Sequence, residues 1–275
     1  MARTAADRKG DPPAPPEPLP VDVVDCHCHL DIMGTDVAAS VAAAQAVGIR
    51  RMITIGVDLE TSRWQAETAA AHADVYAAVA IHPNEAAAGV DDATFDELTR
   101  LATLPKVLAI GETGLDYYRT TPEGHRAQQD SFRRHIDIAK RTDRTLVIHD
   151  REAHEDTLRI LAEEGAPDRV VFHAFSGAAA MARTCADAGY AMSFAGNVTF
   201  KNAQGLRDAA AVAPRELLLV ETDAPFLTPT PWRGRPNGPY LVPLTVRALA
   251  AVRGEDVETT ATALAANAER MFGPW

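Results

Sequence analysis

Residues 21–56 read VDVVDCHCHLDIMGTDVAASVAAAQAVGIRRMITIG. The stretch opens on an apolar, β-branched run, continues through an alanine-rich segment at 36–47, and returns to a second apolar run at 51–56. Near-continuous apolar strands joined by helices are typical of a parallel sheet whose outer face the helices cover. The stretch therefore predicts one strand–helix–strand unit.

The same alternation continues to the C-terminus. Strands are expected at 21–25, 51–56, 75–80, 106–111, 144–149, 169–173, 190–196 and 217–222. Helices are expected at 36–47, 59–73, 92–103, 126–141, 153–164, 178–188, 203–212, 242–252 and 257–272. Eight strands predict an α/β fold closed into a (β/α)8 TIM barrel, as a single domain over residues 21–275. An open doubly wound sheet is the alternative, but no G-x-G-x-x-G follows the first strand to support it.

Residues 1–20 have a different composition from the rest. They hold six prolines, which favour an extended chain without a packed element, so we expect a disordered proline-rich tail. They contain no apolar stretch of the kind that a secretory signal needs, and no segment of the chain reaches the ~20 apolar residues of a membrane span. We therefore expect a cytoplasmic protein with no membrane contact and no obligate protein partner.

Charge and cysteine content narrow the function further. The 275 residues carry a formal net charge of −11, which excludes a protein that binds polyanions over its whole surface. Any site for nucleic acid must therefore hold its positive charge locally. The three cysteines, Cys26, Cys28 and Cys185, are too few for a disulfide framework and are expected to be buried thiols in a reducing compartment.

The first predicted strand ends in Asp25, Cys26, His27, Cys28 and His29. Side chains of a strand alternate between its two faces, so regular alternation places the aspartate and both histidines on one side and both cysteines on the other. Two imidazoles on one side of a strand end converge on a common point. This arrangement indicates a metal site.

Four later strands also end in an imidazole or a carboxylate: Glu112, His149, His173 and Asp223. All strands of a barrel open their C-terminal ends on one face, where the active sites of this fold lie. Nitrogen and oxygen ligands without a thiolate suit Zn²⁺, Mn²⁺, Fe²⁺, Co²⁺ or Mg²⁺. Six ligands are too many for one open catalytic ion, so we expect two divalent ions that share a carboxylate, with Glu112 as the bridge.

Seven motifs in order resemble those of the TatD family of metal-dependent deoxyribonucleases, a branch of the amidohydrolase-like TIM barrels. They are D-C-H-C-H-L-D (25–31), I-H-P (81–83), G-E-T-G-L-D-Y (111–117), V-I-H (147–149), H-A-F-S-G (173–177), V-T-F-K-N (198–202) and E-T-D-A-P (221–225). The resemblance covers about residues 21–272. It implies a two-metal nuclease, with exonuclease activity on single-stranded DNA as the expected form.

The family's ligands fall on the same six residues: His27, His29, Glu112, His149, His173 and Asp223. The resemblance also marks His82 and Lys201 as phosphate contacts. Two departures lie at the expected substrate rim. Asn84 stands where family members often carry a second histidine, and Gly238 stands where the family commonly has an acidic residue.

The expected reaction is attack on phosphorus by a metal-activated water. Asp223 and Glu112 are the predicted catalytic residues; Asp223 would carry the proton, although a purely metal-holding role is the alternative. Positive charge at the rim is expected from Arg119, Lys201, Arg233 and Arg235. Trp232 is a candidate for stacking on a base at a strand end.

Two other functions fit part of this pattern. The same metal chemistry would serve an ester or amide hydrolase, such as a D-aminoacyl-tRNA deacylase or a small-molecule amidohydrolase. In many amidohydrolases a carboxylated lysine occupies the position that is Glu112 here, which disfavours that branch. A metal-binding scaffold without catalysis is the third possibility.

Overall fold

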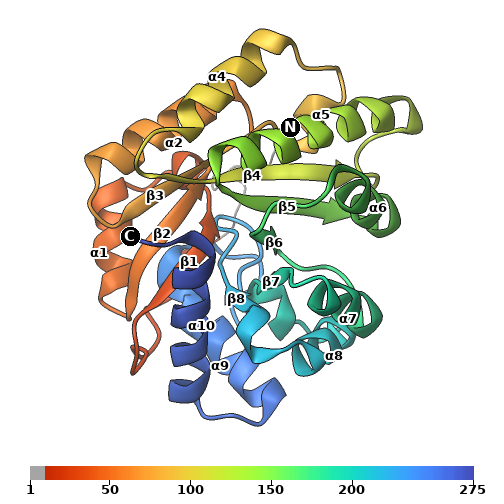
Figure 1. Ribbon diagram of the computed structural model, residues 1–275. Coiled ribbons are helices and arrows are strands. Elements are labelled where there is room, and N and C mark those ends of the chain that lie inside the picture. The colour runs from red at the N-terminus through yellow and green to blue at the C-terminus, as the bar shows by residue number, and fades with distance from the viewer. Residues whose placement is uncertain (1–9) are drawn as a thin grey trace.

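The computed structural model describes residues 10–275. Within them, eight parallel strands pair in chain order (Figure 1). The strands are β1 (Val23–Cys28), β2 (Ile49–Ile55), β3 (Val75–Val79), β4 (Val107–Asp116), β5 (Thr145–Arg151), β6 (Val170–Phe172), β7 (Ala191–Phe194) and β8 (Leu218–Val220). The ring closes where β1 meets the residues after β8: His29 N donates to Ala224 O at 2.8 Å, and Asp223 N donates to His27 O at 2.9 Å. The (β/α)8 barrel is therefore confirmed, and the open sheet is excluded.

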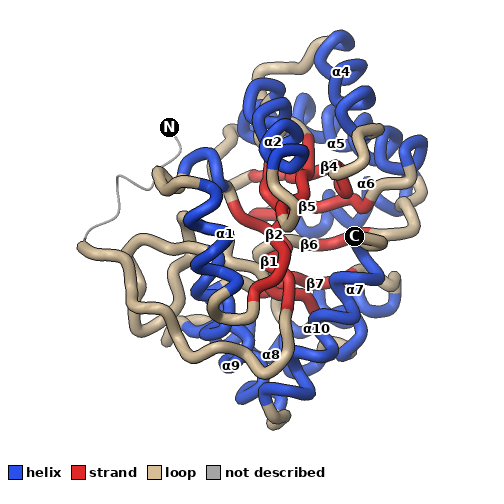
Figure 2. Tube along the Cα trace, turned by 90° about the vertical axis from the view of Figure 1, so that its left-hand side faces the viewer, coloured by secondary structure: helices blue, strands red, loops and turns tan. Residues whose placement is uncertain are grey.

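Helices surround the strands on the outside (Figure 2). They are α1 (Val37–Gln45), α2 (Leu59–Ala71), α3 (Pro83–Ala86), α4 (Asp92–Ala102), α5 (Pro122–Thr142), α6 (His154–Glu164), α7 (Ala179–Asp187), α8 (Gln204–Val212), α9 (Val242–Arg253) and α10 (Val257–Phe272). Short 3₁₀ turns are η2 (Leu30–Ile32), η3 (Gly196–Thr199), η4 (Arg215–Leu217) and η5 (Pro239–Leu241). The sequence did not predict α3, because four residues are too few to show a helical period. Helix α5 begins four residues earlier than expected, with Pro122 at its first position, where a missing N–H costs nothing.

The apolar residues divide into two clusters. The inner cluster takes side chains from all eight strands, such as Val24, Ile53 and Val171, and from the end of α10. The outer cluster lies between the strands and the surrounding helices. Met271 and Phe272 of α10 close the N-terminal end of the barrel, where Thr145 Oγ1 donates to Met271 O. The functional residues therefore meet at the opposite, C-terminal end.

Strand β1 does not alternate regularly. Its register against β2 shifts between Asp25 and Cys28, so that an extra residue is inserted there. Cys26 consequently joins the inner cluster and Cys28 the outer one, and the expectation that both cysteines share one side is wrong. Asp25 accepts hydrogen bonds from the backbone N–H and hydroxyl of Thr222, at 2.9 and 2.5 Å. It therefore ties β1 to the segment after β8.

Strand β4 is longer than the sequence predicts and continues to Asp116. Its pairing with β5 extends through Gly114, whose φ is +135° and whose α-carbon approaches the main chain of β5. A Cβ at Gly114 would lie 2.2 Å from His149 O, so only glycine fits. Glu112 and Asp116 are consequently part of a paired strand beside His149.

The proline-rich segment is only partly as expected. Residues 1–9 of the predicted tail lie outside the described residues. Residues 10–20 form no helix or strand, but they do not lie free of the barrel, because Pro13 and Leu19 are buried. The hydroxyl of Tyr240 donates to Pro13 O at 2.9 Å, and Leu19 N donates to Val47 O at 3.0 Å. The disordered state expected for the whole of 1–20 therefore does not hold for residues 10–20.

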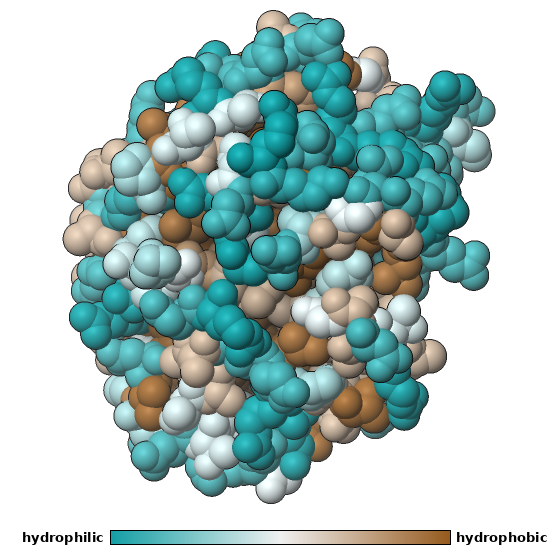
Figure 3. Space-filling view, in the orientation of Figure 1, coloured by the Kyte–Doolittle hydropathy of each residue, from teal (hydrophilic) through white to brown (hydrophobic). Residues whose placement is uncertain are grey.

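The face of the molecule in Figure 3 is mainly hydrophilic, with apolar side chains in small separate patches. Among residues 10–275, no helix combines the length and the apolar character needed to cross a bilayer.

Candidate metal centre

Seven side chains meet at the C-terminal end of the barrel. They are His27 and His29 from β1, His82 after β3, Glu112 from β4, His149 from β5, His173 after β6 and Asp223 after β8. All of them except His82 are residues that the sequence singled out as ligands. Within the described residues, this is where imidazoles and carboxylates gather closely enough to hold a metal ion.

One half of the centre lies around His27 and His29. Their Nε2 atoms are 3.4 Å apart and face each other. Glu112 Oε1 lies 3.8 and 3.5 Å from these two nitrogens, and Asp223 Oδ1 lies 3.8 and 3.6 Å from them. Two nitrogens and two carboxylate oxygens that converge on one point form a donor set suited to a divalent cation.

The other half lies around the second oxygen of the same glutamate. Glu112 Oε2 is 2.8 Å from His173 Nε2 and 3.2 Å from His149 Nδ1, and the two nitrogens are 3.3 Å apart. Glu112 therefore directs one carboxylate oxygen at each half and is shared between the two sets of imidazoles.

Burial and charge act against each other at these residues. Burial disfavours the charged form of Glu112, but His173 and His82 outweigh this effect and hold its pKa well below the usual value. Burial also disfavours the charged form of His173, yet Glu112 and Glu221 hold its pKa well above the usual value. For His27, burial dominates and lowers the pKa well below its usual value. The centre thus keeps an anionic carboxylate and an uncharged imidazole side by side.

Three of the imidazoles are oriented by a partner on the ring nitrogen that faces away from the centre. His29 Nδ1 lies 3.3 Å from Ile55 O. His149 Nε2 lies 3.3 Å from Asp116 Oδ2, and His173 Nδ1 lies 3.3 Å from Glu221 Oε1. Partners of this kind fix the ring orientation of metal-binding histidines. Asp116 and Glu221 are not among the residues expected at the site, although they lie within the motifs G-E-T-G-L-D-Y and E-T-D-A-P.

Two residues at strand ends adopt left-handed backbone conformations. Asp223 has a φ of +53° and Ala174 a φ of +39°. Such conformations cost about 1–3 kcal/mol at residues other than glycine. Asp223 N donates to His27 O, and Ala174 N donates to Glu221 Oε1 at 2.8 Å. These bonds hold the chain in the conformation that brings Asp223 and His173 to the centre.

The structure places the two expected phosphate contacts differently. His82 lies at the centre, with Nε2 3.8 Å from Glu112 Oε2, while Nδ1 accepts a hydrogen bond from Asn84 N at 3.0 Å. Burial lowers the pKa of His82 to about 3, so the ring is neutral and carries its proton on Nε2. Lys201 is exposed on the turn after η3. Its role in phosphate binding stays a prediction.

Arginines at strand ends and in the loop after β8 lie over aromatic rings. Arg151 lies 4.0 Å from the ring centre of Tyr118. Arg233 lies 4.3 Å from that of Phe200. Arg235 lies 5.5 Å from that of Trp232. Such pairs present positive charge and aromatic surface together.

The two departures from the family pattern have structural partners. Asn84 Nδ2 donates to Asp116 Oδ2 at 3.4 Å. A Cβ at Gly238 would lie 2.9 Å from the ring of Tyr240, whose hydroxyl bonds to Pro13 O. Gly238 therefore leaves the space in which Tyr240 packs against the N-terminal segment.

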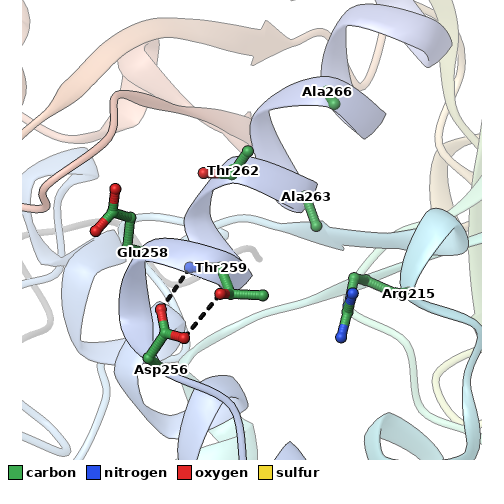
Figure 4. Close-up of a pocket in the computed structure, with 7 residues that line it drawn as sticks. All are labelled: Arg215, Asp256, Glu258, Thr259, Thr262, Ala263 and Ala266. Atoms are coloured by element: carbon green, nitrogen blue, oxygen red, sulfur yellow. Dashed lines mark hydrogen bonds between the residues drawn. The ribbon is translucent and has the colours of Figure 1, made fainter.

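A shallow pocket of about 580 Å³ lies elsewhere, between α10 and the turn η4 that precedes β8 (Figure 4). Its lining comes mainly from the first half of α10, where Asp256 caps the helix by accepting from Thr259 N at 2.7 Å. Because η4 comes before the strand, this pocket belongs to the N-terminal side of the barrel, away from the imidazole cluster.

A TIM barrel that gathers imidazoles and carboxylates at the C-terminal ends of its strands defines the class of barrel metal-dependent hydrolases. The family model described as "TatD related DNase" matches residues 24–273. The chain belongs to the TatD family of metal-dependent hydrolases.

Individual relatives agree with this assignment. The metal-dependent hydrolase TatD of Mycobacterium tuberculosis is 47% identical over 260 residues, which cover 91% of this chain and 98% of that protein. The metal-dependent hydrolase YcfH of Escherichia coli K12 is 37% identical over 256 residues, covering 91% and 95%. The crystal structure of YjjV, a TatD homologue from Escherichia coli K12, superposes with a TM-score of 0.87 at 29% identity and covers 92% of this chain and 98% of that one.

Proposed function

We propose that this hydrolase cleaves phosphodiester bonds of single-stranded DNA with two divalent cations bound on either side of Glu112. The observation that carries the proposal is that the two oxygens of this carboxylate face different imidazoles. Oε1 faces His27 and His29, and Oε2 faces His149 and His173. A single carboxylate shared between two sets of imidazoles suits the paired cations of a two-metal hydrolase.

Each cation would have imidazole ligands of its own, and the two cations would share Glu112. His27, His29 and Asp223 would hold the first, His149 and His173 the second, and Glu112 both. The donor set suits Mg²⁺, Mn²⁺ or Zn²⁺. Bound divalent cations would lower the pKa of water toward about 7 and neutralise the charge of the phosphodiester.

The residues of the chain supply proton transfer and orientation. Asp223 is the more exposed of the two carboxylates, with 14% of its side chain accessible against 5% for Glu112, so it can meet both water and substrate. We assign Asp223 the transfer of a proton from the attacking water to the leaving oxygen. The neutral ring of His82 donates from Nε2 to a phosphate oxygen, since Asn84 N already occupies its Nδ1.

DNA as the substrate is supported by the arginines near the strand ends. Arg151, Arg233 and Arg235 each lie over an aromatic ring, and a charged surface interleaved with aromatic rings suits the backbone and bases of a single strand. The family model's description, "TatD related DNase", points the same way. The cytoplasmic location and the lack of an obligate protein partner stay predictions from the sequence.

The test is hydrolysis by metal-stripped protein reconstituted with Mg²⁺, Mn²⁺ or Zn²⁺. Substrates are an end-labelled single-stranded oligonucleotide, the matching duplex and a D-aminoacyl-tRNA. We expect metal-dependent shortening of the single strand. Deacylation of the tRNA with the DNA intact would establish the ester-hydrolase alternative. Inactivity on all three in every metal would contradict the proposal and leave a small-molecule amidohydrolase or a metal-binding scaffold.

Asp223→Asn tests the proton-transfer role. The amide retains an oxygen for the cation but accepts no proton, so we expect hydrolysis of single-stranded DNA to fall about 10²- to 10⁴-fold. Metal content is measured on the same sample by mass spectrometry. A near wild-type rate with both cations retained would contradict the role and leave Asp223 as a ligand only.

A further inference from the structure

Asp116 is the last residue of β4 and is 1% exposed, yet its carboxylate has two separate sets of partners. Oδ1 accepts from the backbone N–H groups of Tyr118 at 3.1 Å and Arg119 at 2.8 Å. Oδ2 lies 3.3 Å from His149 Nε2. One oxygen therefore holds the turn after β4, and the other faces the imidazole.

His149 and His173 face the second half of the centre with opposite ring nitrogens. His149 directs Nδ1 at Glu112 Oε2, whereas His173 directs Nε2 at the same atom. The outward nitrogen of each ring meets a buried carboxylate, Asp116 for His149 and Glu221 for His173. An anionic acceptor on the outward nitrogen keeps the proton there and leaves the inward lone pair available to a cation.

We propose that Asp116 is the positioning residue of the second cation site, where it fixes His149 as the Nε2-protonated tautomer with Nδ1 directed at the cation. The inference rests on the two-cation function proposed above. It adds a role for Asp116, whose carboxylate touches neither cation nor substrate.

The surroundings of Asp116 hold the carboxylate in place for this role. The side chain of Gln128 forms hydrogen bonds with both main-chain groups of Asp116. Asp116 N donates to Gln128 Oε1 at 3.0 Å, and Gln128 Nε2 donates to Asp116 O at 3.4 Å. Asn84 Nδ2 donates to Oδ2 at 3.4 Å, and Asn84 Oδ1 accepts from Thr120 at 3.2 Å. Asn84, which departs from the family pattern, thus supports the carboxylate with an uncharged donor.

Asp116→Asn separates the two sets of contacts. Its amide oxygen can still accept from the N–H groups of Tyr118 and Arg119, so the turn is kept. Its amide nitrogen then faces His149 Nε2 as a donor, which requires Nε2 to be unprotonated and moves the proton to Nδ1. The matched control is Asp156→Asn. Asp156 lies in α6 and accepts from the hydroxyl of Tyr117, the residue after Asp116, at 2.7 Å, and its other partners are Gln129 and Arg159.

The closing experiment measures cation binding and the tautomer in the same preparations. Equilibrium dialysis with Zn²⁺ is expected to give two sites in the wild type and in Asp156→Asn. In Asp116→Asn we expect one site unchanged and the other about 10- to 100-fold weaker. Imidazole ¹⁵N spectra of the Zn²⁺-loaded protein, assigned with His149→Gln, are expected to show the His149 proton on Nε2 in the wild type.

Two different failures can be told apart. Fewer than two Zn²⁺ ions on the wild type would overturn the two-cation function, while the tautomer of His149 would still test Asp116. A wild-type His149 protonated on Nδ1, or two unchanged sites in Asp116→Asn, would overturn the positioning role. If the variant does not fold, a wild-type His149 that is protonated on Nδ1 still overturns the role.

Discussion

Glu112 lies within 3.8 Å of five imidazoles, those of His27, His29, His82, His149 and His173. A buried carboxylate is costly unless positive groups surround it. Four of these imidazoles, all except that of His82, are also the proposed ligands of the cations. This explains how so polar a cluster persists at the end of an apolar barrel.

A different buried imidazole, His135 in α5, has a purely structural environment. Its Nε2 accepts from Ile81 N at 3.0 Å, and its Nδ1 lies 2.8 Å from Ser131 O. Burial lowers the pKa of His135 from 6.5 to about 4. The ring is therefore neutral in the folded protein over the range in which it is protonated in the unfolded chain.

We expect His135 to make folding depend on pH. A lowered pKa in the folded state means that the stabilisation is complete above pH 6.5 and is lost as the pH falls toward 4. Its full size is about 3 kcal/mol. Urea unfolding of the wild type and of His135→Gln, which keeps an acceptor but does not titrate, measures the difference. If the unfolding free energies of the wild type and of His135→Gln change by the same amount between pH 6.5 and 4, this contribution is ruled out.

At the scale of elements, the N-terminal segment joins parts of the barrel that are distant in the sequence. Arg235 donates to Asp11 O at 3.3 Å, Tyr240 to Pro13 O, and Arg247 in α9 to Glu17 O at 2.9 Å. The first two belong to the loop after β8, which also carries Trp232 and Arg233. The segment therefore holds the loop from which part of the proposed DNA rim is made.

Removal of residues 1–18 is expected to loosen that loop. Four hydrogen bonds of about 0.5–1.5 kcal/mol each are lost, because Pro18 O also accepts from Arg247, and their partial exposure puts the destabilisation near the lower end, about 2–3 kcal/mol in total. Hydrogen exchange should rise over residues 232–241 and stay unchanged in β4 and β5. Tyr240→Phe, which removes only the bond to Pro13, is the milder control. Unchanged exchange in the loop of the shortened chain would refute the idea.

In the molecule as a whole, the residues that stabilise the barrel and the residues of the metal centre lie at opposite ends. The inner cluster and the end of α10 fill the N-terminal end, while the polar centre occupies the C-terminal end. Two divalent cations would change the formal net charge from −11 to about −7, so positive charge is gathered at the centre while the molecule stays acidic. Electrostatic attraction of DNA would thus come only from the C-terminal end of the barrel.

Phe272→Ala tests this separation. The side chain is 3% exposed in the inner cluster, and its removal is expected to cost about 3–5 kcal/mol through lost contacts and a cavity. Cation stoichiometry should stay at the wild-type value, because the centre lies at the other end of the barrel. Thermal unfolding and metal analysis on the same sample give both quantities. Loss of cations in the folded variant would show that the two ends are coupled.

Much of the fold follows from local pattern. Strands buried on both faces appear as apolar runs, and the helices between them as longer amphipathic stretches, so all eight strands were predicted within a few residues of their positions except the end of β4. The six residues of the centre were found for a related reason. Each one interrupts or follows an apolar run with a group that an apolar core would otherwise exclude.

Contacts between distant residues decided the rest. The bulge in β1 that separates Cys26 from Cys28 depends on pairing with β2, and the continuation of β4 past Gly114 depends on the main chain of His149. The roles of Asp116 and Glu221 depend on which imidazole each one meets. Sequence periodicity reports the burial of each residue along its own element. The partner that a side chain meets across the barrel is set only when the chain closes, and so these features required the tertiary structure.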